Sequence, residues 1–151
     1  EVTFRKYERP VVRKERELSK KLCLSLGLLQ PGDSRDVVVD VLHVLLKGKK
    51  RQQLLTVEEI EKKVLINRKL HKLPIAGVAP SNIRRQIKRL RTLFLVDKVK
   101  TKYRISEFSN ISEVFSEKVE KFVLPSILDR VKEYLTLADD VFSGRSGKRK
   151  D

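Results

Sequence analysis

The sequence predicts a mainly α-helical protein with a small β-hairpin, an α+β fold. Apolar residues recur at intervals of three and four along most of the chain, which is the spacing of one helix face. Two short β-rich runs, at 95–99 and 102–106, are joined at Lys100-Thr101 and form a candidate hairpin. The chain has 151 residues, 40% of them hydrophobic, which allows one compact domain plus a helix or two.

The amino-terminal part is expected to be an arm followed by a short helix. Residues 1–17 contain Pro10 and lack a sustained apolar period, so they are interpreted as an extended basic arm, with a frayed terminus as the alternative. Over 18–29 leucines recur at helical spacing, and Gln30-Pro31-Gly32 then ends the segment. We therefore expect a short amphipathic helix there.

The next helix should be the most buried one. Asp33 or Ser34 is a suitable N-cap, apolar residues between 37 and 46 form a broad face, and Gly48 can end the helix. His43 lies among these apolar residues and has no second metal ligand nearby in sequence. We expect it to have a structural role.

A short strand and two further helices are predicted before the hairpin. Residues 53–55 suit a single strand, and Thr56 and Glu59 have the spacing of a capping box for a helix that reaches about residue 72. Pro80 and Ser81 introduce another helix, to about residue 94, because proline suits the first helical position and serine is a good cap.

The last third of the chain is expected to be helical again. The helical spacing resumes after Ser112 and continues to about residue 142, with Pro125 expected to kink or divide the helix. The predicted organisation is a basic arm at 1–17, a domain at 18–106, a helical dimerisation segment at 107–142 and a disordered basic tail at 143–151.

The order of elements within 34–106 is that of a winged helix-turn-helix domain: helix, short strand, helix, helix, hairpin. The segment from Gly77 to Val96 resembles the recognition-helix segment of prokaryotic, especially archaeal, winged-helix transcriptional regulators. In that family small residues and a serine or threonine precede apolar residues at the positions of Ile83, Ile87 and Leu90, and the segment ends in Gly-Leu-Val. This chain departs from the pattern with Phe94 in place of that glycine, and with a longer connection between the two helices. The resemblance implies a winged-helix fold and a DNA-binding function in transcription.

Positive charge is concentrated on the helix predicted at 80–94 and on the hairpin. Residues 81–105 hold nine Lys or Arg and one Asp, whereas residues 106–142 hold four Lys or Arg and eight acidic residues. On a helical wheel Ile83, Ile87 and Leu90 share one face, and the opposite face is cationic without any acidic residue. Like charges one turn apart repel each other, so a polyanionic partner is expected.

Double-stranded DNA is the partner that fits best, because its major groove admits one α-helix. We expect Asn82, Arg85 and Arg89 to contact base edges, and the other basic residues to contact phosphates. The predicted DNA-binding residues are Ser81, Asn82, Arg84, Arg85, Lys88, Arg89, Lys98, Lys100 and Lys102. Alternatives are a solvated basic face, a winged-helix module that binds RNA or protein within a larger assembly, and a replication or chromatin role. Only 6% of the residues are aromatic, which argues against stacking of single-stranded bases.

The carboxy-terminal helical segment is expected to form a homodimer, which would present two recognition helices to a palindromic site. The predicted interface residues are Phe115, Val119, Phe122, Ile127, Val131, Tyr134 and Leu135. The alternative is that this segment packs on its own domain.

Other classes of function fit the sequence poorly. No nucleophile-elbow, P-loop or metalloprotease spacing is present, so neither catalysis nor a cofactor is expected. One cysteine and two histidines cannot form a disulfide or the usual zinc site within one chain. The apolar stretches are too short to span a bilayer, so a cytoplasmic protein is expected. The absence of Met and Trp, with few Asn and Gln, is typical of heat-loving organisms.

Overall fold

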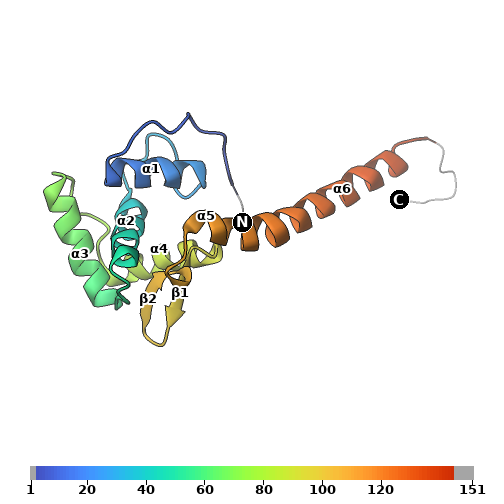
Figure 1. Cartoon of the computed structure of the whole chain (residues 1–151). Coiled ribbons are helices and arrows are strands. Elements are labelled where there is room, and N and C mark those ends of the chain that lie inside the picture. Colours follow the sequence, from blue (N-terminus) through green and yellow to red (C-terminus); the bar gives the residue numbers. More distant parts are fainter. Residues whose placement is uncertain (1–2, 145–151) are drawn as a thin grey trace. The chain divides into compact units, whose positions relative to one another are not determined.

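A computed structural model describes residues 3–144 (Figure 1). It is mainly helical with a small two-stranded antiparallel hairpin, which confirms the predicted α+β class. The chain divides into two compact units, Glu1–Ile111 and Ser112–Asp151. Most of the tail predicted at 143–151 lies outside the described residues.

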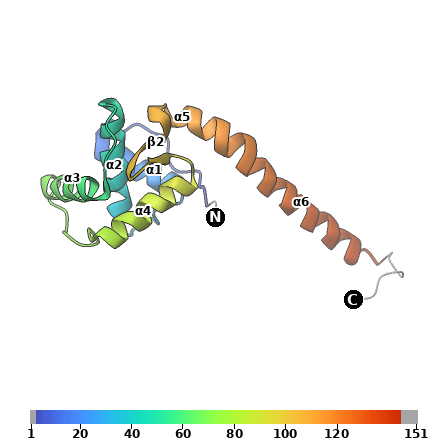
Figure 2. The same ribbon diagram turned by 90° about the horizontal axis from the view of Figure 1, so that it is seen from below.

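The first unit is built around one central helix. Its elements are α1 (Glu15–Ser25), α2 (Val37–Lys50), α3 (Val57–Leu70), α4 (Pro80–Thr92), β1 (Val96–Val99), β2 (Lys102–Ile105) and the short 3-10 helix η1 (Ser106–Phe108). Helix α2 packs against α1, α3, α4 and β2 (Figures 1 and 2). Every residue from Val37 to Leu45 is buried, as expected for the most buried helix.

The amino-terminal arm is shorter than predicted and is packed rather than frayed. Residues 3–14 have no regular secondary structure, and the amide of Arg5 donates a 2.9 Å hydrogen bond to the carbonyl of Ser25. Phe4 and Tyr7 pack against the core. Helix α1 begins at Glu15 instead of residue 18, because the buried Arg16 makes its interior contacts through ion pairs, which an apolar period cannot reveal.

The predicted boundaries of α2 were both wrong. Its N-cap is Asp36 rather than Asp33 or Ser34, and the Asp36 side chain makes no capping hydrogen bond because two arginines bind its carboxylate. Gly48 lies inside the helix, which continues to Lys50.

The α-helices α1 to α4 end in the same way. The residue after each C-cap has positive φ: Gly27 (74°), Gln52 (53°), Lys72 (54°) and Phe94 (63°). After α4, the amide of Phe94 bonds the carbonyl of Arg91, and the amide of Leu95 bonds that of Leu90, as in a Schellman motif. Phe94 thus has the left-handed conformation that glycine adopts most readily.

The hairpin is antiparallel, with Val96 opposite Ile105 and Val99 opposite Lys102. The strand expected at 53–55 is reduced to a bridge between Leu55 and Tyr103, whose amides and carbonyls bond each other at 2.9 and 2.7 Å. The predicted capping box is confirmed: Thr56 and Glu59 bond each other's backbone amides at the start of α3. Helix α4 has Ala79 as its N-cap and Pro80 in its first turn, so Ser81 is not the cap.

The second unit is helical. Short helix α5 (Ile111–Val114) begins at its boundary, a π-type stretch, η2, spans Phe115–Val123, and α6 spans Leu124–Val141. Pro125 lies in the first turn of α6, but Val123 and Leu124 both have right-handed helical φ and ψ, so the backbone stays helical from η2 into α6. Only the hydrogen-bond pattern changes there, from π to α, and the helix is not divided as predicted. None of the helices within residues 3–144 combines the length and apolar character needed to cross a membrane.

Candidate nucleic-acid interface

Helix α4 has one face in the core and one in solvent. Ile83, Ile87 and Leu90 are 0%, 1% and 0% exposed. The positions between them carry polar and cationic side chains, as the helical wheel predicts. The apolar face therefore fixes which side chains of α4 can reach a partner.

The outer face of α4 carries four basic side chains. Arg84, Arg85, Lys88 and Arg91 are exposed. Within the described part of the chain, none of these four forms an ion pair. No carboxylate within residues 3–144 neutralises these four charges, so the face has a positive potential.

Arg89 has a different position from the other arginines of α4. It is half-buried, and its guanidinium donates to the carbonyl of Leu28 at 2.7 Å and to Oε1 of Gln86 at 2.9 Å. Leu28 belongs to the loop between α1 and α2. Arg89 therefore connects α4 to that loop, a role that sequence reasoning missed.

Asn82 is also engaged inside the protein. Its Nδ2 donates a 2.6 Å hydrogen bond to the carbonyl of Gly77, and its Oδ1 accepts one from Gln86 Nε2 at 3.0 Å. These contacts hold the loop before α4 against its first turn. Of the three residues expected at base edges, Arg85 is the one whose side chain extends into solvent; its nearest polar contact is a long 3.4 Å bond to Asn82.

The hairpin adds a second basic surface. Lys98, Lys100 and Lys102 are all exposed, and Lys100 has a φ of 58° in the turn. Asp97, the one acidic residue of 81–105, accepts from Arg104 Nε at 2.8 Å, and this hydrogen bond raises the pKa of Arg104. The acid is thus neutralised locally, and the three lysines keep their charge.

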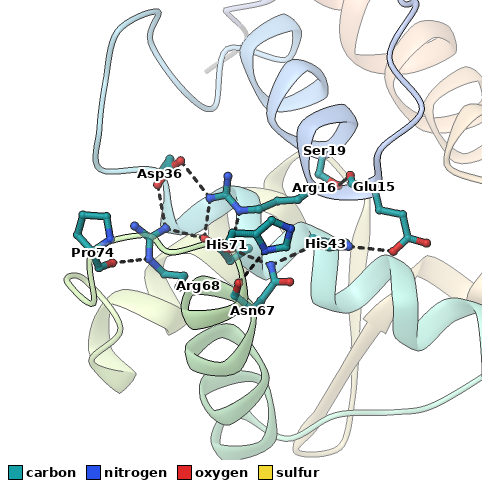
Figure 3. Close-up of polar contacts among 10 residues, drawn as sticks. Glu15, Arg16, Ser19, Asp36, His43, Asn67, Arg68, His71 and Pro74 are labelled. Carbon is teal, nitrogen blue, oxygen red and sulfur yellow. Dashed lines mark hydrogen bonds and ion pairs between the residues drawn. The ribbon is translucent and has the colours of Figure 1, made fainter.

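A buried ion-pair cluster joins α1, α2 with its N-cap, and α3 (Figure 3). Arg68 NH1 bonds Asp36 at 2.8 Å and Asp40 at 2.7 Å, and Arg16 bonds the same two carboxylates at 2.9–3.1 Å. All four residues are buried. Burial alone would raise the pKa of Asp36, but the hydrogen bonds from Arg68 and Arg16 lower it below its ordinary value. Sequence reasoning missed this cluster, although Asp40 within an apolar run was a signal of it.

His43 extends the cluster toward solvent. Asn67 Nδ2 lies 2.8 Å from Asp40 Oδ1 and 3.1 Å from His43 Nδ1, and His43 Nε2 lies 3.1 Å from Glu15 Oε1. Burial lowers the pKa of His43 more than Glu15 raises it, so the ring is neutral at pH 7. His43 therefore has polar partners on both ring nitrogens, in keeping with the structural role expected for it.

The predicted dimer residues differ in accessibility. Phe122, Ile127, Val131, Tyr134 and Leu135 are exposed, whereas Phe115 is half-buried and Val119 is buried. The exposed residues on α6 belong to one stripe, because apolar side chains recur there at intervals of three and four.

Comparison with protein-family models, with curated proteins and with solved structures gives no match for this chain.

Proposed function

We propose that the protein is a winged helix-turn-helix module that binds double-stranded DNA sequence-specifically and regulates transcription. The observation that carries the proposal is the outer face of α4, where Arg84, Arg85, Lys88 and Arg91 are exposed and, within residues 3–144, unpaired. A rigid helix with such a face suits the major groove, since phosphates line both of its edges.

The basic residues divide into two groups. Arg85 reads base edges, because an exposed guanidinium can bond guanine O6 and N7 together. Arg84 and Lys88 contact phosphates, and so do Lys98, Lys100 and Lys102 on the hairpin, which forms the wing. Asn82 and Arg89 position α4 through their bonds to Gly77 and Leu28, and contribute to recognition indirectly.

We propose further that α6 pairs with α6 of a second copy. Leu124, Ile127, Val131, Tyr134, Ala138 and Val141 follow one another at alternating intervals of three and four, the spacing of a coiled-coil seam. Leu128 and Leu135 lie beside this seam and are exposed, so the apolar stripe is wider than one contact row. A two-fold dimer would present two α4 helices to a palindromic site with half-sites about 10 bp apart or a multiple of that spacing.

The test of the DNA proposal is a salt titration measured by fluorescence anisotropy with duplex DNA, single-stranded DNA and duplex RNA. Neutralising about five to eight phosphates predicts that the logarithm of the affinity for duplex DNA falls against the logarithm of salt with a slope of roughly −5 to −7. Equal affinity for all three nucleic acids would contradict the proposal and favour an RNA-binding or assembly role.

A pair of variants with the same loss of charge shows which surface of the protein binds DNA. One variant replaces Arg84, Arg85, Lys88 and Arg91 by glutamine, and the control replaces Lys118, Lys121, Arg130 and Lys132 by glutamine. Both lose the same net charge. The α4 variant should lose most of its affinity and show a slope shallower by roughly 2, because Arg84 and Lys88 contact phosphates, whereas the control should retain most of both. An equal loss in the two variants would mean that net charge alone drives binding.

A further inference from the structure

A cavity lies between α1 and α2, on the side of the first unit where the buried cluster reaches solvent. Its volume is about 440 Å³, within the range of roughly 300 to 1,000 Å³ that is typical of small-molecule pockets. Its apolar wall is formed by Leu18, Leu22, Leu46 and Ile111. Lys47, Lys50 and Arg51 line the same cavity. An apolar wall beside a cluster of cations suits a ligand with a hydrocarbon part at one end and an anionic group at the other.

The chain supplies a fixed hydrogen-bond donor to this cavity. Asn67 Nδ2 has two hydrogens, and its two acceptors are Asp40 Oδ1 and His43 Nδ1. His43 Nδ1 is therefore an acceptor, so the proton of the neutral ring is on Nε2. That N–H is directed at Glu15 Oε1, 3.1 Å away, and Lys47 Nζ lies 3.8 Å from the same oxygen. The buried ring and the lysine together form a binding point for a carboxylate.

The carboxylate that occupies this binding point in the structure is that of Glu15, and it is largely exposed to solvent. The Glu15 side chain is 66% exposed, whereas that of His43 is 4% exposed. An exposed carboxylate in an ion pair of this kind contributes little to stability, so another carboxylate can replace it at small cost. Figure 3 shows Glu15 reaching His43 from α1, at the edge of the cluster.

We propose that this cavity binds a small aliphatic carboxylate. The ligand's carboxylate takes the place of Glu15 at His43 Nε2 and Lys47 Nζ, and its hydrocarbon part lies against Leu18, Leu22 and Leu46. The site does not depend on DNA binding, and it involves no covalent step.

The experiment is isothermal titration calorimetry of the full chain with octanoate, and with octanamide as the neutral control. Octanoate should bind roughly tenfold or more tightly than octanamide, because only the carboxylate makes charge-assisted hydrogen bonds. Three variants then test the site. Glu15→Ala removes the competing carboxylate and should tighten octanoate binding by about two- to fivefold. Lys47→Gln should weaken it by a similar factor, and Leu18→Trp should abolish it by filling the cavity.

Glu17→Ala and Lys62→Gln, at exposed positions outside the cavity, are the matched controls and should leave octanoate binding unchanged. Equal binding of octanoate and octanamide would overturn the proposal, and so would the absence of any heat from wild type and Glu15→Ala at millimolar octanoate. It would also be overturned if Glu15→Ala bound octanoate no more tightly than wild type, or if Leu18→Trp bound octanoate as well as wild type. Circular dichroism of each variant verifies that it is folded. DNA affinity is measured separately, so failure of one proposal leaves the other intact.

Discussion

Replacing Arg68 by methionine should be among the most destabilising single changes in this protein. Arg68 is 2% exposed, and its guanidinium bonds both Asp36 and Asp40 and also the carbonyl of Pro74 at 2.7 Å. Methionine retains much of the side-chain volume but leaves two buried carboxylates with one arginine between them. Removing one partner of a buried ion pair costs about 3 to 5 kcal/mol, so the free energy of unfolding should fall by that amount.

Guanidinium chloride unfolding, followed by circular dichroism, measures this loss. Lys69→Met changes the exposed neighbour on α3 and should alter stability by no more than about 0.5 kcal/mol. The double variant Arg68→Met with Asp36→Asn should lose less than the sum of its single losses, by about 1 kcal/mol or more, because the second change removes the unpaired charge. A loss below about 1 kcal/mol for Arg68→Met, or strict additivity in the double variant, would refute the reasoning.

Four further outcomes follow from the same structure. Lys72→Gly should stabilise the protein by about 1 kcal/mol in thermal unfolding, because an exposed lysine with a φ of 54° occupies a left-handed C-cap position; destabilisation would contradict this. Arg89→Ala should lower the melting temperature and weaken binding to specific and random DNA alike, whereas Arg85→Ala should cost about 1 to 3 kcal/mol on the specific site only. Stability should fall as the pH drops below about 6.5, where the unfolded chain protonates His43 but the folded ring resists, and again below about 3.8, where the unfolded chain protonates Asp36 but the folded carboxylate keeps its charge; a His43→Gln variant should lack the first step. Replacing Phe122 and Tyr134 by serine should yield monomers in light scattering, and an unchanged mass would place the interface elsewhere.

Local signals predicted much of the fold. The capping box at Thr56 and Glu59, the proline that starts α4 and the hairpin around Lys100 each depend on a few neighbouring residues, so a single sequence is enough to find them. The apolar face of α4 was predicted for the same reason, and with it the cationic outer face.

The interior polar contacts could not be predicted in the same way. The periodicity of apolar residues predicts that a charged residue faces solvent, so Arg16 and Arg68 are predicted to lie on the surface. Both are in fact buried against acidic residues that are distant in sequence. Arg89 likewise looks like its neighbours on a helical wheel, and only the three-dimensional position of Leu28 distinguishes it. The end of α2 was misjudged because Gln52, not Gly48, adopts the left-handed conformation.

The buried cluster also has a consequence for how the first unit assembles. Its two arginines and two aspartates come from α1, from α2 with its N-cap, and from α3, so the interior is electrically balanced only when all three segments are in place. Docking of α2 on α3 alone would enclose one excess negative charge. A polypeptide that lacks residues 1–16, and with them Arg16, should therefore be a poor folding unit, and in the full chain α1 should lose its structure in the same cooperative transition as α2 and α3.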